Sequence, residues 1–99
     1  MPLTIYDVFL EQVTIAEVKQ PTCVEGLEVL PANISLTGAE IELIGKDDRE
    51  YILKEALDKV KDDYDFVIID CPPSLNLITI NALTAADTVL VPIQCEYFA

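Results

Sequence analysis

The apolar positions of this chain follow two patterns, a helical period over the first two thirds and unbroken apolar runs near the end. The helical period is clearest in residues 49–61, which follow Asp47 and Asp48, two charges that favour a helix N-terminus. The apolar residues of this predicted helix share one face: Leu53, Ala56, Leu57 and Val60. We expect this helix to be scaffold.

Shorter elements are predicted before it. They are a helix at 4–10 capped by Thr4, a helix opened by a capping box of Thr14 and Glu17, a strand at 27–30 that Pro31 ends, and a helix at 36–44 closed by Gly45. On the helix at 49–61, Glu50 with Lys54 and Glu55 with Lys59 have the spacing of stabilising ion pairs. After it, the acids at 62, 63 and 65 lack the glycine and distal glutamate of a calcium loop, so a solvated turn is favoured.

The unbroken apolar runs predict two buried strands, 66–69 and 88–93. A helix is predicted between them at 76–86. A strand, a helix and a strand within about thirty residues form a βαβ unit. With the strand at 27–30, the sequence predicts an α/β fold with three recognisable strands in a parallel sheet and flanking helices.

Asp70 comes directly after the first of these runs and is the candidate functional residue. Pro72 and Pro73 end the strand, because proline has no N–H for the sheet and fixes its own φ. Ligands in open α/β sheets bind outside the carboxyl ends of the strands, so Asp70 is a candidate residue for a metal or phosphate site. A plain turn-opening aspartate is the alternative, and Ser74 is interpreted as a helix N-cap.

A phosphoacceptor receiver domain also ends a buried strand with aspartate. Such a domain needs an acidic pair after its first strand and a lysine after a later one. Here Pro31 and Gln94 follow the corresponding strands, so the receiver interpretation is disfavoured.

Composition narrows the class of protein. With 99 residues and 52% hydrophobic residues, we expect one domain, residues 1–99, with a packed core. A formal charge of −12 would repel a phosphate backbone, so direct nucleic-acid binding is not expected. No run reaches the ~20 apolar residues of a membrane span, and the start lacks a signal-peptide pattern, which favours a cytoplasmic protein.

The remaining chemistry of the sequence is sparse. The cysteines at 23, 71 and 95 are far apart and the chain has no histidine, so we interpret them as reduced, partly buried thiols. The three glycines are isolated, and no glycine-rich loop that could cradle a phosphate is present. Without histidine or a G-x-S-x-G context, Ser74 has no recognisable catalytic partner.

Residues 64–99, YDFVIIDCPPSLNLITINALTAADTVLVPIQCEYFA, resemble the central part of the ParA/Soj family of partition ATPases. This family has a deviant Walker A loop and is related to MinD. The stretches TIYDVFLEQVTIAEV, VEGLEVLPANISLTGAEIELI and LKEALDKVKDDYDFVIID resemble consecutive segments of the same family in the same order. The resemblance covers nearly the whole chain.

The resemblance implies a role for the segment that begins at Asp70. Asp70 would be the Walker B aspartate, which orients Mg²⁺ through a coordinated water beside ATP. Cys71, Pro72, Pro73 and Ser74 would lie near the γ-phosphate and the dimer partner. A complete member is expected to bind ATP and Mg²⁺, to form a homodimer around nucleotide, and to segregate a chromosome or plasmid with a ParB-type partner.

The family's phosphate-binding lysine loop and its water-positioning acid lie upstream of the matched residues, and its DNA-binding residues lie downstream. We therefore expect an interior fragment of a P-loop NTPase fold that lacks the P-loop strand, binds no ATP or Mg²⁺ and does not hydrolyse ATP. Without that strand, the strands at 66–69 and 88–93 would not be neighbours and would expose unpaired edges and apolar faces. The alternative is a non-catalytic interaction module that pairs with a full-length ParA-like protein.

Overall fold

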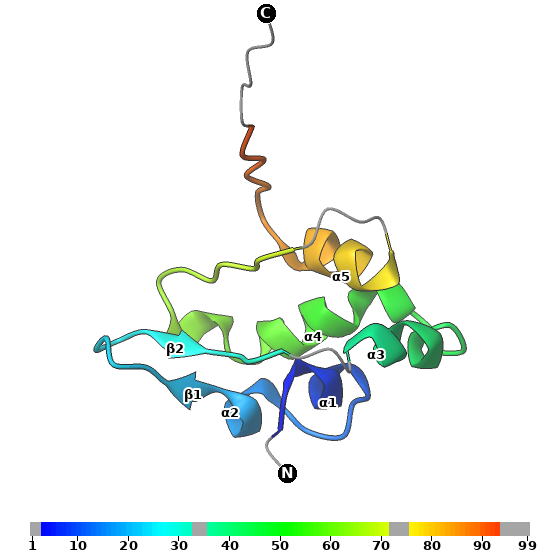
Figure 1. The fold of residues 1–99 in the computed structure, drawn as a ribbon, viewed down its shortest axis with the longest axis horizontal. Helices are drawn as coiled ribbons and strands as arrows, with labels where there is room; N and C mark the ends of the chain where they lie inside the picture. The colour runs from blue at the N-terminus through cyan, green and yellow to red at the C-terminus, as the bar shows by residue number, and fades with distance from the viewer. Residues whose placement is uncertain (1–2, 33–35, 72–75, 94–99) are drawn as a thin grey trace, which may run out of the picture.

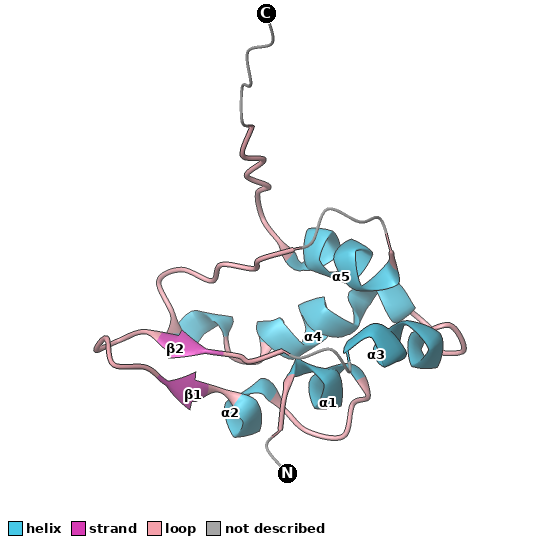
Figure 2. Cartoon of the chain, viewed as in Figure 1, coloured by secondary structure: helices cyan, strands magenta, loops and turns pink. Residues whose placement is uncertain are grey.

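The computed structural model describes residues 3–32, 36–71 and 76–93 (Figure 1). Helices dominate the described part, with one small sheet at the side (Figure 2). The elements in chain order are α1 (Ile5–Phe9), α2 (Ile15–Val18), β1 (Gln20–Pro21), β2 (Glu28–Val29), α3 (Leu36–Leu43), η1 (Arg49–Tyr51), α4 (Ile52–Asp58), η2 (Lys61–Asp63) and α5 (Leu77–Ala85). The predicted helices at 4–10, 36–44 and 76–86 are thus confirmed to within two residues at each end.

The first two helices begin at the predicted caps but differ in their bonding. At α1, the Thr4 hydroxyl accepts from the Tyr6 N–H at 3.2 Å, and the Asp7 carboxylate accepts from the Thr4 N–H at 2.9 Å. At α2, Thr14 is the N-cap, but its hydroxyl donates to the Glu17 carboxylate at 3.3 Å and makes no cap bond. The predicted capping box of α2 is therefore wrong, although the helix is present.

The single helix predicted at 49–61 is divided into η1, α4 and η2. Asp48 precedes η1 in a left-handed conformation with φ 52°, so the chain turns sharply there. The predicted ion pairs are wrong as well: Asp58 accepts from Lys54 at 3.2 Å and lies 3.3 Å from Lys61. Asp58 lies within one helical turn of both lysines, so Lys54 pairs with Asp58 and not with the predicted Glu50. Val60, beyond the end of α4, is buried in the core.

Two hydrophobic clusters hold the helices together. The larger consists of buried side chains from α1, α3, α4 and α5: Phe9, Leu43, Ile52, Leu53 and Ala82. The second lies under α2 and the end of α4: Val8, Ile15, Val18 and Val60. We call the helices around these clusters the helical body. The face predicted for residues 53, 56, 57 and 60 is confirmed, since all four side chains are buried or half-buried there.

The predicted parallel sheet is not formed by the described residues. Their one sheet is antiparallel and joins β1 to β2, with Gln20 opposite Val29 and Pro21 opposite Glu28. It confirms the centre of the strand predicted at 27–30. The segments 66–69 and 88–93, which we call the apolar segments, belong to no sheet. A strand needs a neighbouring strand to pair its backbone groups, and neither segment lies beside one here.

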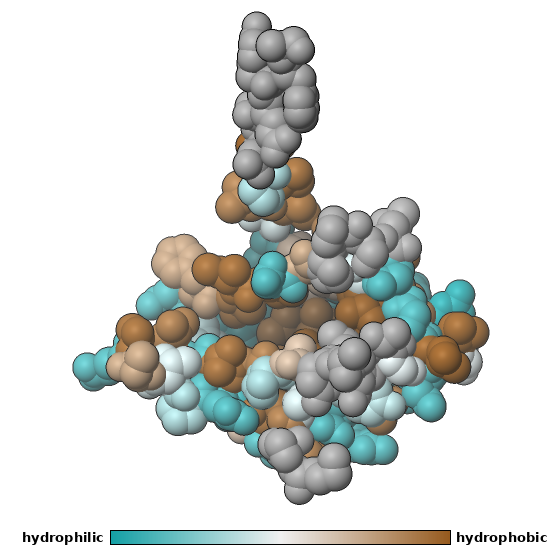
Figure 3. All heavy atoms as spheres, viewed as in Figure 1, coloured by the Kyte–Doolittle hydropathy of each residue, from teal (hydrophilic) through white to brown (hydrophobic). Residues whose placement is uncertain are grey.

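The two apolar segments also differ in how far the helical body buries their side chains. Along 66–69 the exposure alternates: Phe66 is 87% exposed, Val67 47% and Ile68 91%, whereas Ile69 is half-buried. One face of this segment therefore rests on the helical body and the other is open, so the predicted burial on both faces is wrong. The segment 88–93 runs away from the body (Figure 1), and its apolar side chains form a hydrophobic surface in Figure 3. Both segments have the exposed faces expected for strands that are not neighbours.

Candidate functional site

The candidate site begins at Asp70, the first polar residue after the apolar segment 66–69. Ile69 packs against the larger hydrophobic cluster, which fixes the backbone directly before Asp70. Asp70 itself is exposed, so its carboxylate is open to solvent. No hydrogen bond or ion pair joins the Asp70 carboxylate to another side chain in the described part of the chain. Within the described residues, Asp70 is thus anchored through Ile69 while its carboxylate stays open to solvent.

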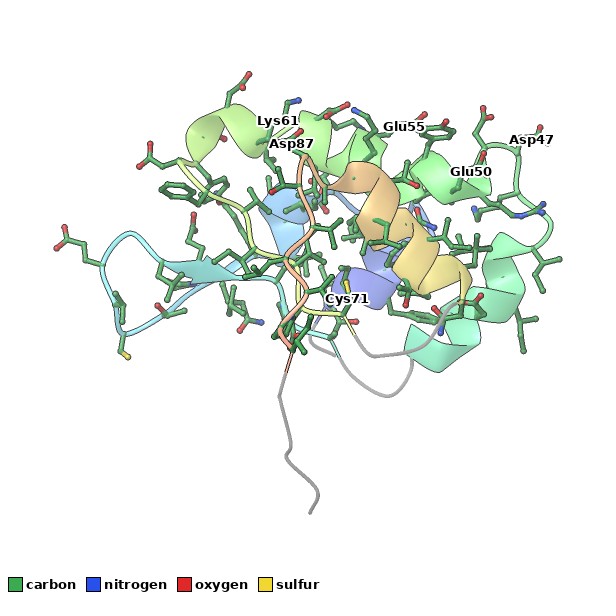
Figure 4. The ribbon with its side chains drawn as sticks, turned by 90° about the horizontal axis from the view of Figure 1, so that it is seen from above. Asp47, Glu50, Glu55, Lys61, Cys71 and Asp87 are labelled. Atoms are coloured by element: carbon green, nitrogen blue, oxygen red, sulfur yellow. The ribbon has the colours of Figure 1, made fainter. Side chains whose placement is uncertain are left out.

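Cys71 follows Asp70 and is also exposed. Its thiol lies 3.9 Å from the Ile69 carbonyl oxygen, a weak contact that turns the sulfur back toward the chain. Figure 4 shows Cys71 at the end of its segment, on the opposite side of the view from Asp47, Glu50 and Glu55. The prediction of partly buried thiols is wrong for Cys71 and for Cys23, which is exposed on the loop between β1 and β2.

Several predicted residues lie outside the described residues. These are Pro72, Pro73 and Ser74 of the candidate site, Gln94, and Cys95. In the part that is described, Asn76 is the N-cap of α5, and its side-chain oxygen accepts from the Thr79 N–H at 2.9 Å. The N-cap of this helix therefore comes two residues later than Ser74.

The donor atoms near Asp70 decide whether the described residues could hold a metal. Mg²⁺ takes six oxygen ligands in near-octahedral geometry, commonly one or two carboxylates with waters and phosphates. No group of three acidic, cysteine or histidine side chains able to hold an ion occurs within residues 3–32, 36–71 and 76–93. These residues therefore fit the role of one acidic contributor to a Mg²⁺ site and do not form such a site themselves.

A shallow hollow elsewhere on the surface does not include the candidate site. It lies between the α1–α2 connection and α4, with Val8, Ile52 and Val60 among its apolar lining and Glu11 and Glu55 among its charged lining. Neither Asp70 nor Cys71 lines it. The chemistry suggested at Asp70 therefore does not extend into this hollow.

Two residues to which the sequence assigned no functional role, Asn81 and Glu40, support the elements around the site. Asn81 of α5 is fully buried, and its side-chain oxygen accepts from the Leu53 N–H at 3.1 Å. Its side-chain NH₂ group donates to the Arg49 carbonyl at 2.8 Å and to the Leu77 carbonyl at 2.9 Å. Glu40 of α3 accepts from the first two N–H groups of α5. A lone amide among apolar helix residues could have indicated Asn81. Glu40 has no such signal, because its partners are 37 and 38 residues away.

Ionisable groups with shifted pKa values lie on other elements. Lys19 donates to the Tyr64 hydroxyl at 3.0 Å and to Glu28 at 3.3 Å, and the Tyr64 hydroxyl donates to Glu28 at 2.6 Å. The Tyr64 hydrogen bonds are the main reason that the pKa of Lys19 is raised and that of Glu28 is lowered. Lys54 and then Lys61 lower the pKa of Asp58 by hydrogen bonding. None of these groups adjoins Asp70 in the chain.

Among the helices of the described residues, none has the length and apolar content of a membrane span.

Comparison with known proteins identifies the family. A family model described as an AAA domain matches residues 1–99. The sporulation initiation inhibitor protein Soj of Bacillus subtilis is 54% identical over 96% of this chain, and the chromosome partitioning protein ParA of Myxococcus xanthus is 53% identical over 97%. The chain spans 38% and 34% of the length of these two relatives, so about a third of a relative is represented.

A solved structure has the same fold over the shared region. The structure is described as cobyrinic acid a,c-diamide synthase from Mycobacterium smegmatis with bound ATP analog and magnesium. It is 50% identical, with a TM-score of 0.91 over 97% of this chain and 39% of that chain. The described residues therefore have the architecture of part of a P-loop NTPase, in which their helices pack as observed here. The AAA domain model matches residues 1–99, and the Soj and ParA proteins named above are 54% and 53% identical to this chain. The chain therefore belongs to the ParA/Soj family.

Proposed function

We propose that this chain is the central segment of a cytoplasmic ParA/Soj-type ATPase that partitions a chromosome or plasmid, and that Asp70 is its Mg²⁺-site acid. The single observation that carries the proposal is the placement of Asp70. Its carboxylate is exposed directly after Ile69, whose side chain is anchored in the core. An acid so held can orient a Mg²⁺-bound water without moving when the ion binds.

The names of the similar proteins support the nucleotide part of the proposal. A relative in Treponema pallidum, 50% identical over 98% of this chain, is named chromosome-partitioning ATPase Soj. The similar M. smegmatis structures are described with an ATP analog or ADP and magnesium. Their described activity differs from partitioning, so the shared chemistry is binding of an adenine nucleotide with Mg²⁺. Cys71, Pro72 and Pro73 would then lie beside the terminal phosphate.

The complete protein would act through parts that the described residues do not supply. Phosphoryl transfer needs a lysine loop around the phosphates and a group that orients the attacking water. We propose that a complete protein forms a homodimer around ATP and engages a ParB-type partner. By itself, the 99-residue chain is expected to bind neither ATP nor Mg²⁺ tightly and to hydrolyse no ATP.

The test compares two acids in the full-length protein that carries this segment. Asp70→Asn should lower the Mg²⁺-dependent rate of ATP hydrolysis by about 100-fold or more, because the amide cannot replace a charged metal-site acid. Asp87→Asn, at an exposed acid just after α5, is the matched control and should leave the rate unchanged. Equal rates for Asp70→Asn and the unaltered protein would overturn the assignment of Asp70.

A second candidate is a non-catalytic module that pairs with a full-length ParA-like protein. The exposed faces of the apolar segments favour it, because an unpaired apolar segment can add to the sheet edge of another chain. Equilibrium dialysis with ATP tests what the two candidates share, because micromolar binding of ATP by the 99-residue chain would contradict both. Binding of the chain to a full-length relative separates them: tight binding that Asp70→Asn does not change would favour the module.

A further inference from the structure

The first turn of α5 is held by a carboxylate from another helix. The Leu77 N–H donates to Glu40 Oε1 at 2.5 Å, and the Ile78 N–H donates to Glu40 Oε2 at 3.0 Å. Asn76 is the N-cap: its side-chain oxygen accepts from the Thr79 N–H at 2.9 Å, and its carbonyl accepts the first ordinary helical bond, from the Ile80 N–H, at 2.9 Å. The N–H groups of the first helical residues have no partner within the helix, and at α5 those of Leu77, Ile78 and Thr79 obtain one from Glu40 and Asn76.

This arrangement is specific to Glu40. A helix is ordinarily capped by its own flanking residues, as α1 is by Thr4. Glu40 instead reaches α5 from the middle of α3, and each of its oxygens takes a separate N–H. Its negative charge lies at the positive end of the α5 dipole, which strengthens both hydrogen bonds. Glu40 therefore fixes where α5 starts relative to α3.

The start of α5 and the residue before Asp70 pack against the same hydrophobic cluster. The side chains of Leu77 and Ile78 pack against the larger hydrophobic cluster, and so does Ile69. A shift of Leu77 and Ile78 would change the surface on which Ile69 lies, because protein cores are close-packed and transmit small displacements. Ile69 is bonded directly to Asp70. Glu40, the first turn of α5 and Ile69 are therefore connected through the larger hydrophobic cluster, and Asp70 follows Ile69 directly.

We propose that Glu40 is a positioning residue for Asp70: by clamping the first turn of α5, it holds the core surface that seats Ile69 and sets the position of the Asp70 carboxylate. This inference deepens the function proposed above and rests on it where nucleotide is concerned. The contrasting role is purely local, in which Glu40 stabilises α5 and leaves Asp70 undisturbed. The two roles differ in what happens at Asp70 and Cys71 when Glu40 is changed.

The first measurement needs no nucleotide. Cys71 adjoins Asp70, and its thiol contacts the Ile69 carbonyl, so its rate of alkylation reports on this point of the chain. In the full-length protein that carries this segment, Glu40→Ala should raise the alkylation rate of Cys71 at least threefold, measured for each cysteine by mass spectrometry. The exposed thiol of Cys23, on the loop between β1 and β2, should react at an unchanged rate.

Two further variants make the result specific. Glu42→Ala removes an exposed acid from the same helix and should change neither cysteine. Glu40→Gln keeps one acceptor oxygen and should give a Cys71 rate between those of the unaltered protein and Glu40→Ala. Circular dichroism checks that the helices remain, and Glu40→Gln decides the question if Glu40→Ala unfolds. An unchanged Cys71 rate in a folded Glu40 variant would overturn the proposal.

The second measurement uses the proposed activity. Glu40→Ala should raise the Mg²⁺ concentration for half-maximal ATP hydrolysis by about 10-fold, as loss of a residue that orients a metal ligand does, while Glu42→Ala should not. A faster Cys71 with an unchanged Mg²⁺ requirement would show that Glu40 influences the chain at Cys71 without setting the position of the Asp70 carboxylate, and would overturn the inference. Absence of ATP hydrolysis in the unaltered full-length protein would overturn the proposed function instead, and the Cys71 rates would still decide the role of Glu40.

Discussion

The apolar segments are richer in hydrophobic residues than the chain as a whole, yet they are less buried than the helical body, because the two regions differ in where their backbone hydrogen bonds come from. A helix pairs its N–H and C=O groups within itself, so α1, α4 and α5 need only a partner for their apolar faces. A strand pairs its groups with another strand, and within the described residues neither 66–69 nor 88–93 has one. Hydrophobicity alone therefore does not bury a segment. Burial follows only where the backbone is also satisfied.

The largest expected effect on stability comes from comparing a leucine-to-alanine substitution in the helical body with one in an apolar segment. Leu43 is 0% exposed in the larger cluster, whereas Leu90 is 91% exposed in the segment 88–93. Leu43→Ala should lower the free energy of unfolding by about 2–5 kcal/mol, because it removes buried methyl groups and leaves a cavity. Leu90→Ala should change it by less than about 0.5 kcal/mol. Urea unfolding of both variants makes the comparison, and equal losses would mean that the segment 88–93 is covered in solution.

The next effect concerns how the body joins its own helices. Asn81 connects α5 to the start of α4 through its bonds with Leu53 and Arg49. Asn81→Ala should lower the free energy of unfolding by roughly 2–3 kcal/mol, because it leaves a buried N–H and a carbonyl without partners. The exposed amide of Gln20 in β1 is the control, and Gln20→Ala should be close to neutral. A neutral Asn81→Ala would indicate that water replaces the amide.

The sequence predicted the body better than the apolar segments, for a physical reason. Helix caps and helical periods are local, so Thr4, the face at 53–60 and the helix at 76–86 could be read from neighbouring residues. The strands at 66–69 and 88–93 have the composition of buried strands, but whether they pair depends on residues far away in the chain. A high strand propensity therefore predicts a strand only where a partner strand is available, and the described residues contain no partner strand for these segments.

The candidate site shows the same division. The sequence placed Asp70 at the end of an apolar run that two prolines stop, and Asp70 is exposed there, although the run itself is not buried on both faces as predicted. The carboxylate of Glu40 could not be predicted, because its bonds to Leu77 and Ile78 depend on how α3 packs against α5. The charge pairs of α4 were also missed, since spacing fits several partners equally well and Asp58 has lysines on both sides.

A smaller expected effect concerns a buried hydroxyl group of the helical body that lacks a hydrogen bond in the part of the chain described. The hydroxyl of Thr79 in α5 is buried and has no hydrogen-bond partner among the described residues. Thr79→Val removes it at similar volume and should raise the free energy of unfolding by about 1 kcal/mol. Thr84 is the control in the same helix, because its hydroxyl donates to the Ile80 carbonyl at 2.8 Å. Thr84→Val should not stabilise the protein, and a gain equal to that of Thr79→Val would contradict this explanation.

The smallest effect lies where the body meets the segment 66–69. Tyr64, two residues before Phe66, donates to Glu28 of β2 and accepts from Lys19. The pKa of Glu28 is lowered from 4.5, so its stabilising contribution is present above about pH 4.5 and is lost as the pH falls through the lower folded value. The pKa of Lys19 is raised from 10.5, so its contribution is present below about pH 10.5 and is lost as the pH rises through the higher folded value.

Both shifts depend first on the Tyr64 hydroxyl, which makes one substitution decisive. Tyr64→Phe should return the pKa of Glu28 toward 4.5 and flatten the dependence of stability on pH below that value. The control is Tyr51→Phe at an exposed tyrosine of η1, which should leave the titration of Glu28 unchanged. Titration of the Glu28 carboxyl by NMR measures the shift directly. If Glu28 kept its low pKa in Tyr64→Phe, Lys19 and not Tyr64 would be the main cause of the shift, which would contradict the assigned role of the Tyr64 hydroxyl.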